Sequence, residues 1–260
     1  MTRRLLLTLL LLAVVAPSLG GSVVVVRRAA GGGSVFPYTF DFSADPTSNG
    51  WSEQHDTGIP SYNGTDDDED FVMTTAGDLG TLLFDTAMAS GEQCVCYTLS
   101  DDGGQHGAVG LLLRAPADPD ASGDTHSIIV IPWFEGSATS DTMYIAIVDE
   151  NGWSCDVAHA SLNLAQGGRL CAQITGTGAW VTGGTATAIR LFYNQPSDDC
   201  TGTTAVSYTN WAADSGSPST CLNSTVAGYT DSQSHAGIIS LESGSGSGTM
   251  SADDYAATEM

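Results

Sequence analysis

The chain contains about a dozen short runs of apolar and β-branched residues with turn residues between them, and no long run of apolar residues at helical spacing. Such runs are typical of strands that hairpins and loops connect. The clearest hairpin signal is Asp149–Gly152, because Asn-Gly readily supplies the positive φ angles of a tight turn. The predicted strands are Val35–Phe42, Phe71–Thr74, Thr81–Asp85, Gln93–Leu99, Ala108–Arg114, Ser127–Phe134, Met143–Val148, Trp153–Val157, Arg169–Thr175, Ala188–Tyr193, Gly237–Leu241 and Met250–Tyr255.

The last two runs, His235–Leu241 and Gly248–Tyr255, are separated by glycine and serine and predict two antiparallel strands that close a sheet. The run Tyr38–Phe42 also alternates, so we expect the first and last strands to lie side by side. This number of strands predicts an all-β fold, a two-sheet antiparallel jelly-roll sandwich. We expect one domain over residues 35–260, with a cysteine-containing insertion at about 194–234.

The N-terminal segment has the pattern of an export signal. Arg3 and Arg4 precede the apolar run Leu5–Val15, and small residues follow at Ser18 and Gly20. We therefore expect residues 1–20 to be a signal peptide, residues 21–34 a flexible linker, and the protein to be secreted, with no membrane span after cleavage. The alternative is a retained hydrophobic segment, Leu5 to Val26, that anchors the chain to a cell surface or a virion.

The charge balance is strongly acidic. The chain has 30 acidic residues against seven basic ones, and the basic residues are all arginine, so the net charge is −23. Because such a surface repels phosphates, we exclude nucleic acid as a partner. The charge fits a role in solubility or adaptation to salt, and alternatively the binding of divalent cations.

An even number of cysteines in a chain with an export signal predicts disulfide bonds. Cys94 and Cys96 stand two apart on one strand and face the same way, so each is expected to bond elsewhere. Two arrangements are open: Cys200 with Cys221, which flank the insertion, and Cys155 with Cys171, on neighbouring predicted strands. A zinc site is the competing interpretation of Cys94 and Cys96. The full set is Cys94, Cys96, Cys155, Cys171, Cys200 and Cys221, and the glycosylation sequons begin at Asn63 and Asn223.

Several motifs, taken in order, resemble the concanavalin A-like lectin/glucanase superfamily, close to laminin-G-like jelly rolls. The motifs are Phe40–Asp45, Gly50-Trp51, Ala108–Arg114, Ser127–Ile131, Leu170–Gly176, Ala236–Leu241 and Asp253–Tyr255. The resemblance covers the chain from about Val35 to Glu259 and implies a concanavalin A-like fold with a bias towards glycan or surface binding. The stretch from Asn194 to Ser234 departs from these domains, which usually have a compact hairpin there.

The resemblance also bears on catalysis and on calcium. Glycoside hydrolases of this superfamily carry a Glu-x-Asp-x-Glu strand, and this sequence has none, so we expect no enzymatic activity and no catalytic residues. Related jelly rolls often hold a structural cation at a sheet edge. Asp41 on the first strand and Asp253 or Asp254 on the last are therefore the expected Ca²⁺ ligands, while the acidic run Asp66–Asp70 is more typical of a solvated loop.

Aromatic residues are the remaining candidates for ligand binding, because sugars stack their apolar faces on exposed rings. Trp153 follows a tight turn, and Tyr208 and Trp211 lie in the insertion, so these three are the predicted glycan-binding residues. Trp51, Trp133 and Trp180 are expected to pack in the core or at strand edges.

Together these features favour a secreted, non-catalytic lectin-like module that binds a glycan or a cell-surface polysaccharide and serves in adhesion. The first alternative is a structural virion or extracellular filament protein, in which the same jelly-roll domain decorates a larger assembly. The weaker alternative is a glycoside hydrolase.

Overall fold

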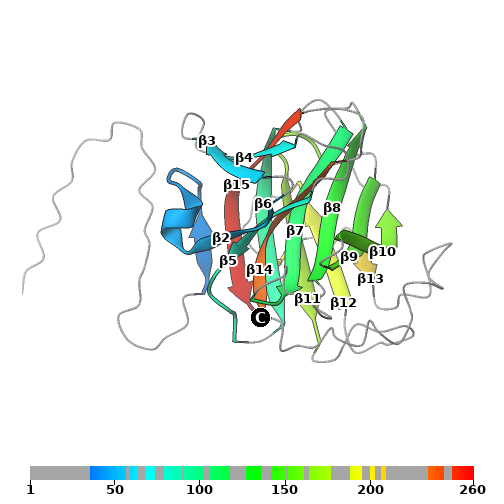
Figure 1. Cartoon of the computed structure of the whole chain (residues 1–260). Coiled ribbons are helices and arrows are strands. Elements are labelled where there is room, and N and C mark those ends of the chain that lie inside the picture. The colour runs from blue at the N-terminus through cyan, green and yellow to red at the C-terminus, as the bar shows by residue number, and fades with distance from the viewer. Residues whose placement is uncertain are drawn as a thin grey trace, which may run out of the picture.

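The computed structural model describes residues 36–56, 59–63, 68–73, 79–89, 91–101, 106–117, 127–135, 142–149, 152–160, 164–176, 188–194, 200–202, 206–208, 234–242 and 248–260. Two antiparallel sheets pack face to face (Figure 1). The predicted all-β, two-sheet sandwich is therefore confirmed.

Sheet A has eight strands and sheet B has seven. The order in sheet A is β13 (Val206–Tyr208), β12 (Ala188–Tyr193), β11 (Arg169–Thr175), β6 (Gln93–Asp101), β15 (Gly248–Glu259), β4 (Asp68–Met73) and β3 (Ile59–Asn63), with β1 (Tyr38–Phe40) also on β15. The order in sheet B is β10 (Gly152–Ala160), β9 (Thr142–Asp149), β8 (Ser127–Glu135), β7 (His106–Ala115), β14 (His235–Glu242), β5 (Leu79–Phe84) and β2 (Trp51–Asp56). One turn of 3₁₀-helix, η1, spans Pro46–Asn49.

The expected hairpin around Asn151-Gly152 is confirmed, because β9 and β10 pair antiparallel with Gly152 opposite Asp149. Three strands were not predicted. β2 and β13 are polar or short, and β3 contains Pro60, which fits a strand at the edge of a sheet. None of them has the apolar alternation on which the prediction relied.

One prediction about the C-terminal strands was wrong. β14 and β15 do not pair with each other: β14 lies between β7 and β5 in sheet B, and β15 lies between β6 and β4 in sheet A. Both strands place apolar residues in the same core, Ile238 from one side and Tyr255 from the other. The two runs therefore face each other across the sandwich, where alternation alone cannot distinguish facing from pairing.

The pairing of the first and last strands is confirmed. β1 runs antiparallel to β15, with Tyr38 opposite Ala257 and Phe40 opposite Tyr255. Here Trp51 packs against the Tyr255 ring at a centroid distance of 4.7 Å, and Tyr38 stacks on Phe84 at 4.0 Å. Trp51 Nε1 donates a hydrogen bond to the Tyr38 hydroxyl at 3.1 Å. These aromatic contacts hold the N-terminal strand on the sandwich.

Two buried tyrosines in this core allow a matched test. The Tyr97 hydroxyl donates to the carbonyl of Val109 at 2.6 Å, whereas the Tyr255 hydroxyl is buried without a hydrogen-bond partner. Burial raises the pKa of both hydroxyls well above the usual range, so both stay protonated at neutral pH.

Tyr97→Phe should lower the free energy of unfolding by about 1–3 kcal/mol, because it leaves a buried carbonyl without its donor. Tyr255→Phe should leave stability unchanged or raise it, because it removes an unsatisfied polar atom. Urea unfolding of both variants checks this pair. Equal losses in the two variants would contradict the structure.

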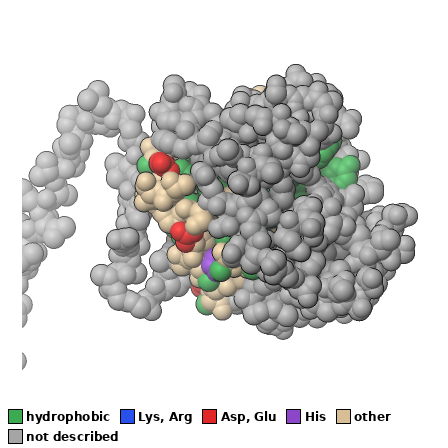
Figure 2. All heavy atoms as spheres, viewed as in Figure 1, with side chains coloured by type: hydrophobic (Ala, Val, Ile, Leu, Met, Phe, Trp, Pro, Cys, Tyr) green, Lys and Arg blue, Asp and Glu red, His purple; other side chains and the backbone are tan. Residues whose placement is uncertain are grey.

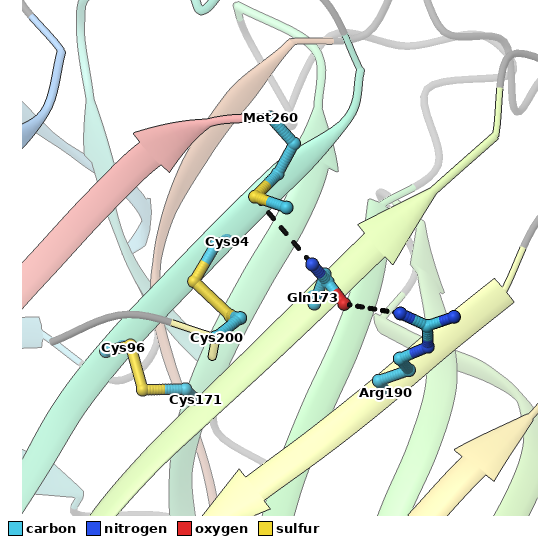
Figure 3. The surroundings of a disulfide bond; sticks show 7 residues. All are labelled: Cys94, Cys96, Cys171, Gln173, Arg190, Cys200 and Met260. Carbon is cyan, nitrogen blue, oxygen red and sulfur yellow. Dashed lines mark hydrogen bonds between the residues drawn. A yellow bond between two sulfur atoms is a disulfide. The ribbon is translucent and has the colours of Figure 1, made fainter. Parts of the chain in front are cut away.

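The outer face of sheet A carries two disulfide bonds, Cys94–Cys200 and Cys96–Cys171 (Figure 3). Cys96 and Cys171 stand directly opposite each other on the paired strands β6 and β11. As expected, Cys94 and Cys96 each bond elsewhere. The Sγ atoms of Cys94, Cys96 and Cys200 lie within 4.8 Å of one another, and the structure places all three in disulfides. Because the sulfur atoms of Cys94 and Cys96 are in disulfide bonds, they are not thiolates that could bind zinc, as the competing interpretation required.

The two pairings suggested by the sequence are not the ones observed. Cys200 bonds Cys94 and not Cys221, because the chain after β12 returns to the outer face of sheet A. Cys171 bonds Cys96 and not Cys155, because β10 and β11, although consecutive, belong to different sheets. Cys155 lies opposite Ile147 in the sheet B ladder, and Cys221 lies outside the described residues.

In denatured, unreduced protein, Cys94, Cys96, Cys171 and Cys200 should not react with a thiol reagent. Removal of either bond by a double serine substitution should cost about 2–5 kcal/mol of stability. Mass-spectrometric mapping and thiol counting check the connectivity. Six reactive thiols would refute it.

Candidate functional site

Sheet B is apolar on both faces. On its inner face, alternate residues such as Leu111, Ile128 and Ile238 belong to the core between the sheets. The residues between them point to the opposite face, because side chains alternate along a strand. They form a second buried group, which we call the outer cluster: Leu83, Leu112, Ala115, Ile129, Ile131 and Ile239.

The outer cluster ends in an aromatic pair formed by Trp133 on β8 and Tyr144 on β9. Both side chains are partly buried and pack against the outer cluster. Their ring centroids are 6.1 Å apart and the rings meet edge to face at 79°. Tyr144 stands opposite Ile131, and Trp133 opposite Thr142, in the β8–β9 ladder. The pair therefore adds two partly accessible rings to a buried apolar floor.

The floor beneath the aromatic pair is closely packed. A Cβ atom added at Gly110 would lie 2.7 Å from the Cα of Ile131, closer than neighbouring strands allow. Ile129 and Ile131 are fully buried. The two rings therefore pack against a floor in which position 110 has no room for a side chain larger than glycine.

Trp133 was expected from the sequence to pack in the core or at a strand edge, and the aromatic pair was not predicted. The signal that would have identified this face is the unbroken apolar character of Leu111-Leu112-Leu113 and Ile128–Ile131. A strand with one solvated face alternates, whereas an unbroken run indicates burial on both faces.

Of the three aromatic residues predicted to bind glycans, two are described, and they lie in different sheets. Trp153 lies on β10 opposite Val148, in sheet B, whereas Tyr208 lies on β13 opposite Ile189, in sheet A. Trp211 lies outside the described residues. The sequon residue Asn63 ends β3, and Asn223 is also outside the described residues.

Arginine is scarce on the surface of the folded part. All 30 acidic residues lie after residue 35. The basic residues in this part of the chain are Arg114, Arg169 and Arg190. Arg114 is fully buried and Arg169 is 8% exposed, so Arg190 is the exposed one. On the face shown in Figure 2, the described side chains include carboxylates and a histidine but no arginine.

The buried arginines are held by main-chain oxygens. Arg114 donates from Nε to the carbonyl of Gly91 at 2.7 Å and from Nη2 to the carbonyl of Gly176 at 2.6 Å. Arg169 Nη1 donates to the carbonyl of Asp254 at 2.6 Å. Both guanidinium groups thus tie strand ends together inside the fold.

The predicted calcium ligands lie far apart in the sequence, and strand pairing brings them towards each other without forming a cluster of ligands. Beyond the β1–β15 ladder the backbone brings Asp41 towards Asp254. Asp41 Oδ1 already accepts hydrogen bonds from Ser43 N at 3.2 Å and Ser43 Oγ at 2.8 Å. Among the described residues, the carboxylate oxygens of Asp41, Asp253 and Asp254 do not belong to any group of three or more possible metal ligands within 4.8 Å of one another. As they stand, these residues do not fit a calcium site, and the site stays a prediction.

Salt should stabilise this acidic domain, because counterions screen the repulsion among its carboxylates. We expect the melting temperature to rise with NaCl, by about 2–4 °C for each kcal/mol gained. CaCl₂ at equal ionic strength separates screening from specific binding. A larger rise with CaCl₂ that Asp41→Asn abolishes would establish the calcium site, and equal rises in the two salts would exclude it.

Among the described residues, no helix has the length and apolar character needed to cross a membrane.

One histidine, His235, is the first residue of β14. Burial lowers the pKa of His235, in spite of the opposing effect of Asp85, so this side chain is neutral at pH 7.

No protein-family model and no curated protein sequence matches the chain. Solved structures do. A protein of unknown function with a galectin-like fold from Bacillus subtilis is 12% identical, with a TM-score of 0.54 over 85% of this chain and 94% of that one. An engineered GH43 glycoside hydrolase with endo-xylanase and exo-arabinofuranosidase activity is 15% identical, with a TM-score of 0.50 over 90% of this chain and 42% of that one.

A third structure, the carbohydrate-binding module CBM66 from Bacillus subtilis, is 10% identical, with a TM-score of 0.46 over 81% of this chain and 96% of that one. The first two likenesses show the fold. They confirm the fold expected from the sequence motifs, a two-sheet jelly roll.

Proposed function

We propose that the protein is a secreted, non-catalytic carbohydrate-binding module whose ligand contacts the Trp133–Tyr144 pair. The observation that carries the proposal is this partly accessible aromatic pair on a buried apolar floor, at the outer face of sheet B. Fold alone does not set function, so the proposal depends on these side chains.

The chemistry of the pair suits a sugar. The C–H groups on one side of a pyranose ring pack against an aromatic face, while its hydroxyls hydrogen-bond to polar groups around the ring. Because Trp133 and Tyr144 are already packed against fixed neighbours, binding costs little side-chain entropy.

Two further observations support a secreted module. An apolar run, Leu5–Val15, follows Arg3 and Arg4 at the N-terminus, as in export signals. The disulfides Cys94–Cys200 and Cys96–Cys171 are of a kind that persists in oxidising compartments. The absence of a Glu-x-Asp-x-Glu strand from the sequence favours binding without hydrolysis. One structure of similar fold is a glycoside hydrolase, so hydrolysis has to be measured and not assumed absent.

Trp133→Ala and Tyr144→Ala should each weaken retention on a bound polysaccharide by about tenfold, since a well-placed aromatic contact contributes about 1.4 kcal/mol or more. Trp133→Phe should retain much of the affinity because it keeps a ring. Affinity electrophoresis against a panel of polysaccharides measures retention, and the melting temperature confirms that each variant folds.

Trp153→Ala and Trp211→Ala are the variants for comparison, because the sequence predicted that these two residues bind glycan. If the ligand contacts the Trp133–Tyr144 pair, both variants should keep the wild-type affinity. If Trp153→Ala abolishes binding while Trp133→Ala does not, the site lies at the β10 edge. Failure of the wild-type protein to bind any polysaccharide would refute the proposed function and favour a structural role in an assembly. Release of reducing sugar would show an enzyme.

A further inference from the structure

We propose that the ligand of this module is an uncharged glycan, and that the protein discriminates against sulfated and uronic-acid polysaccharides. This inference rests on the proposed function and narrows it to one class of ligand. It follows from where the arginines of the described part of the chain lie, since the sequence contains no lysine.

Proteins that recognise anionic sugars need cations at the site, typically arginine, whose planar guanidinium group binds sulfate or carboxylate with two hydrogen bonds. Beyond residue 35 this chain contains no lysine and only Arg114, Arg169 and Arg190. Among the described residues, the location of these three side chains therefore decides whether an anionic ligand meets a lysine or arginine.

Two of the three arginines are not available to a ligand. Arg114 is fully buried, and its Nε and Nη2 atoms are engaged by the carbonyls of Gly91 and Gly176. Arg169 is 8% exposed, and its Nη1 donates to Thr98 Oγ1 at 2.9 Å and to the Asp254 carbonyl. Both guanidinium groups thus make hydrogen bonds inside the fold.

The third arginine lies on the other side of the molecule. Arg190 is on β12 of sheet A, and it donates to Gln173 Oε1 at 3.3 Å beside the Cys94–Cys200 disulfide (Figure 3). Its neighbours Ile189 and Leu191 point into the core, so Arg190 faces outward from sheet A. The Trp133–Tyr144 pair faces outward from sheet B. The whole sandwich separates Arg190 from the aromatic pair.

The remaining charge acts against an anionic ligand. Residues 36–260 carry 30 acidic side chains against three arginines, and the summed field of this net negative charge repels sulfate and carboxylate groups before contact. An uncharged glycan is not repelled by this field. Stacking of a sugar on Trp133 and Tyr144 does not require a charge on the sugar. The charge distribution thus selects among glycans that have equal shape and differ in charge.

The test compares matched polymers at pH 8, where histidines with their ordinary pKa of about 6.5 are neutral. The pairs are dextran with dextran sulfate, hydroxyethylcellulose with carboxymethylcellulose, and agarose with carrageenan, each measured at 50 mM and 500 mM NaCl. We expect retention only on neutral members. For any backbone that binds, the charged member should bind at least tenfold more weakly at 50 mM NaCl, and less of that gap should remain at 500 mM.

Two variants test the cause. Thr142 stands directly opposite Trp133 on β9, so Thr142→Lys places a cation beside the aromatic pair and should narrow the discrimination. Arg190→Gln, on the opposite face, is the matched control and should leave it unchanged.

Equal or stronger binding of a sulfated or carboxylated polymer would overturn the inference while the carbohydrate-binding function stands. Binding to no polymer of either kind would overturn both. Binding to cationic chitosan alone, lost in 500 mM NaCl and unaffected by Trp133→Ala, would be simple ion exchange and would also overturn the inference.

Discussion

The burial of sheet B on both faces is the constraint on which the rest of the structure depends. A β-sandwich needs one apolar face on each sheet, and sheet A meets this requirement with the core between the layers. Sheet B adds a second apolar face, the outer cluster around Leu112, Ile129 and Ile239. The aromatic pair exists because that face ends at Trp133 and Tyr144, where burial becomes partial. The proposed site is thus the margin of a packed surface.

The two sheets have different roles. Sheet A carries the covalent cross-links, Cys94–Cys200 and Cys96–Cys171, on its outer face. Arg190, the exposed cation, lies on the same face. Sheet B carries the aromatic pair. The disulfide bonds and the exposed arginine therefore lie on one side of the sandwich, and the aromatic pair lies on the other.

Much of the fold was predictable because short runs of apolar and β-branched residues between turn residues are typical of strands. The runs around Gln93, Arg169 and Ala188 gave three neighbouring strands of sheet A at nearly their observed limits. The pairing of Tyr38 with the C-terminal strand was also predictable, since both ends of the domain alternate. Sheet membership was not: β10 and β11 are consecutive and yet belong to opposite layers, which is why the Cys155–Cys171 suggestion failed. Alternation gives the face of a residue but not its partner strand.

The site was less predictable than the fold. Trp133 was expected to pack in the core or at a strand edge and was therefore not a predicted binding residue. It does pack, against the outer cluster of sheet B. The predicted residues were chosen for their nearness to turns, a criterion that selects exposed positions without asking whether they converge. Trp153 and Tyr208 accordingly lie in different sheets.

The position of β15 has a consequence for the cooperativity of sheet A. In the described part of sheet A, β6 and its neighbours on one side, and β4, β3 and β1 on the other, are joined through β15 alone. Any change that displaces β15 therefore frees the edges of β6 and β4 at the same time. Unpaired strand edges pair readily with another chain, so the loss of this one strand would expose the domain to aggregation.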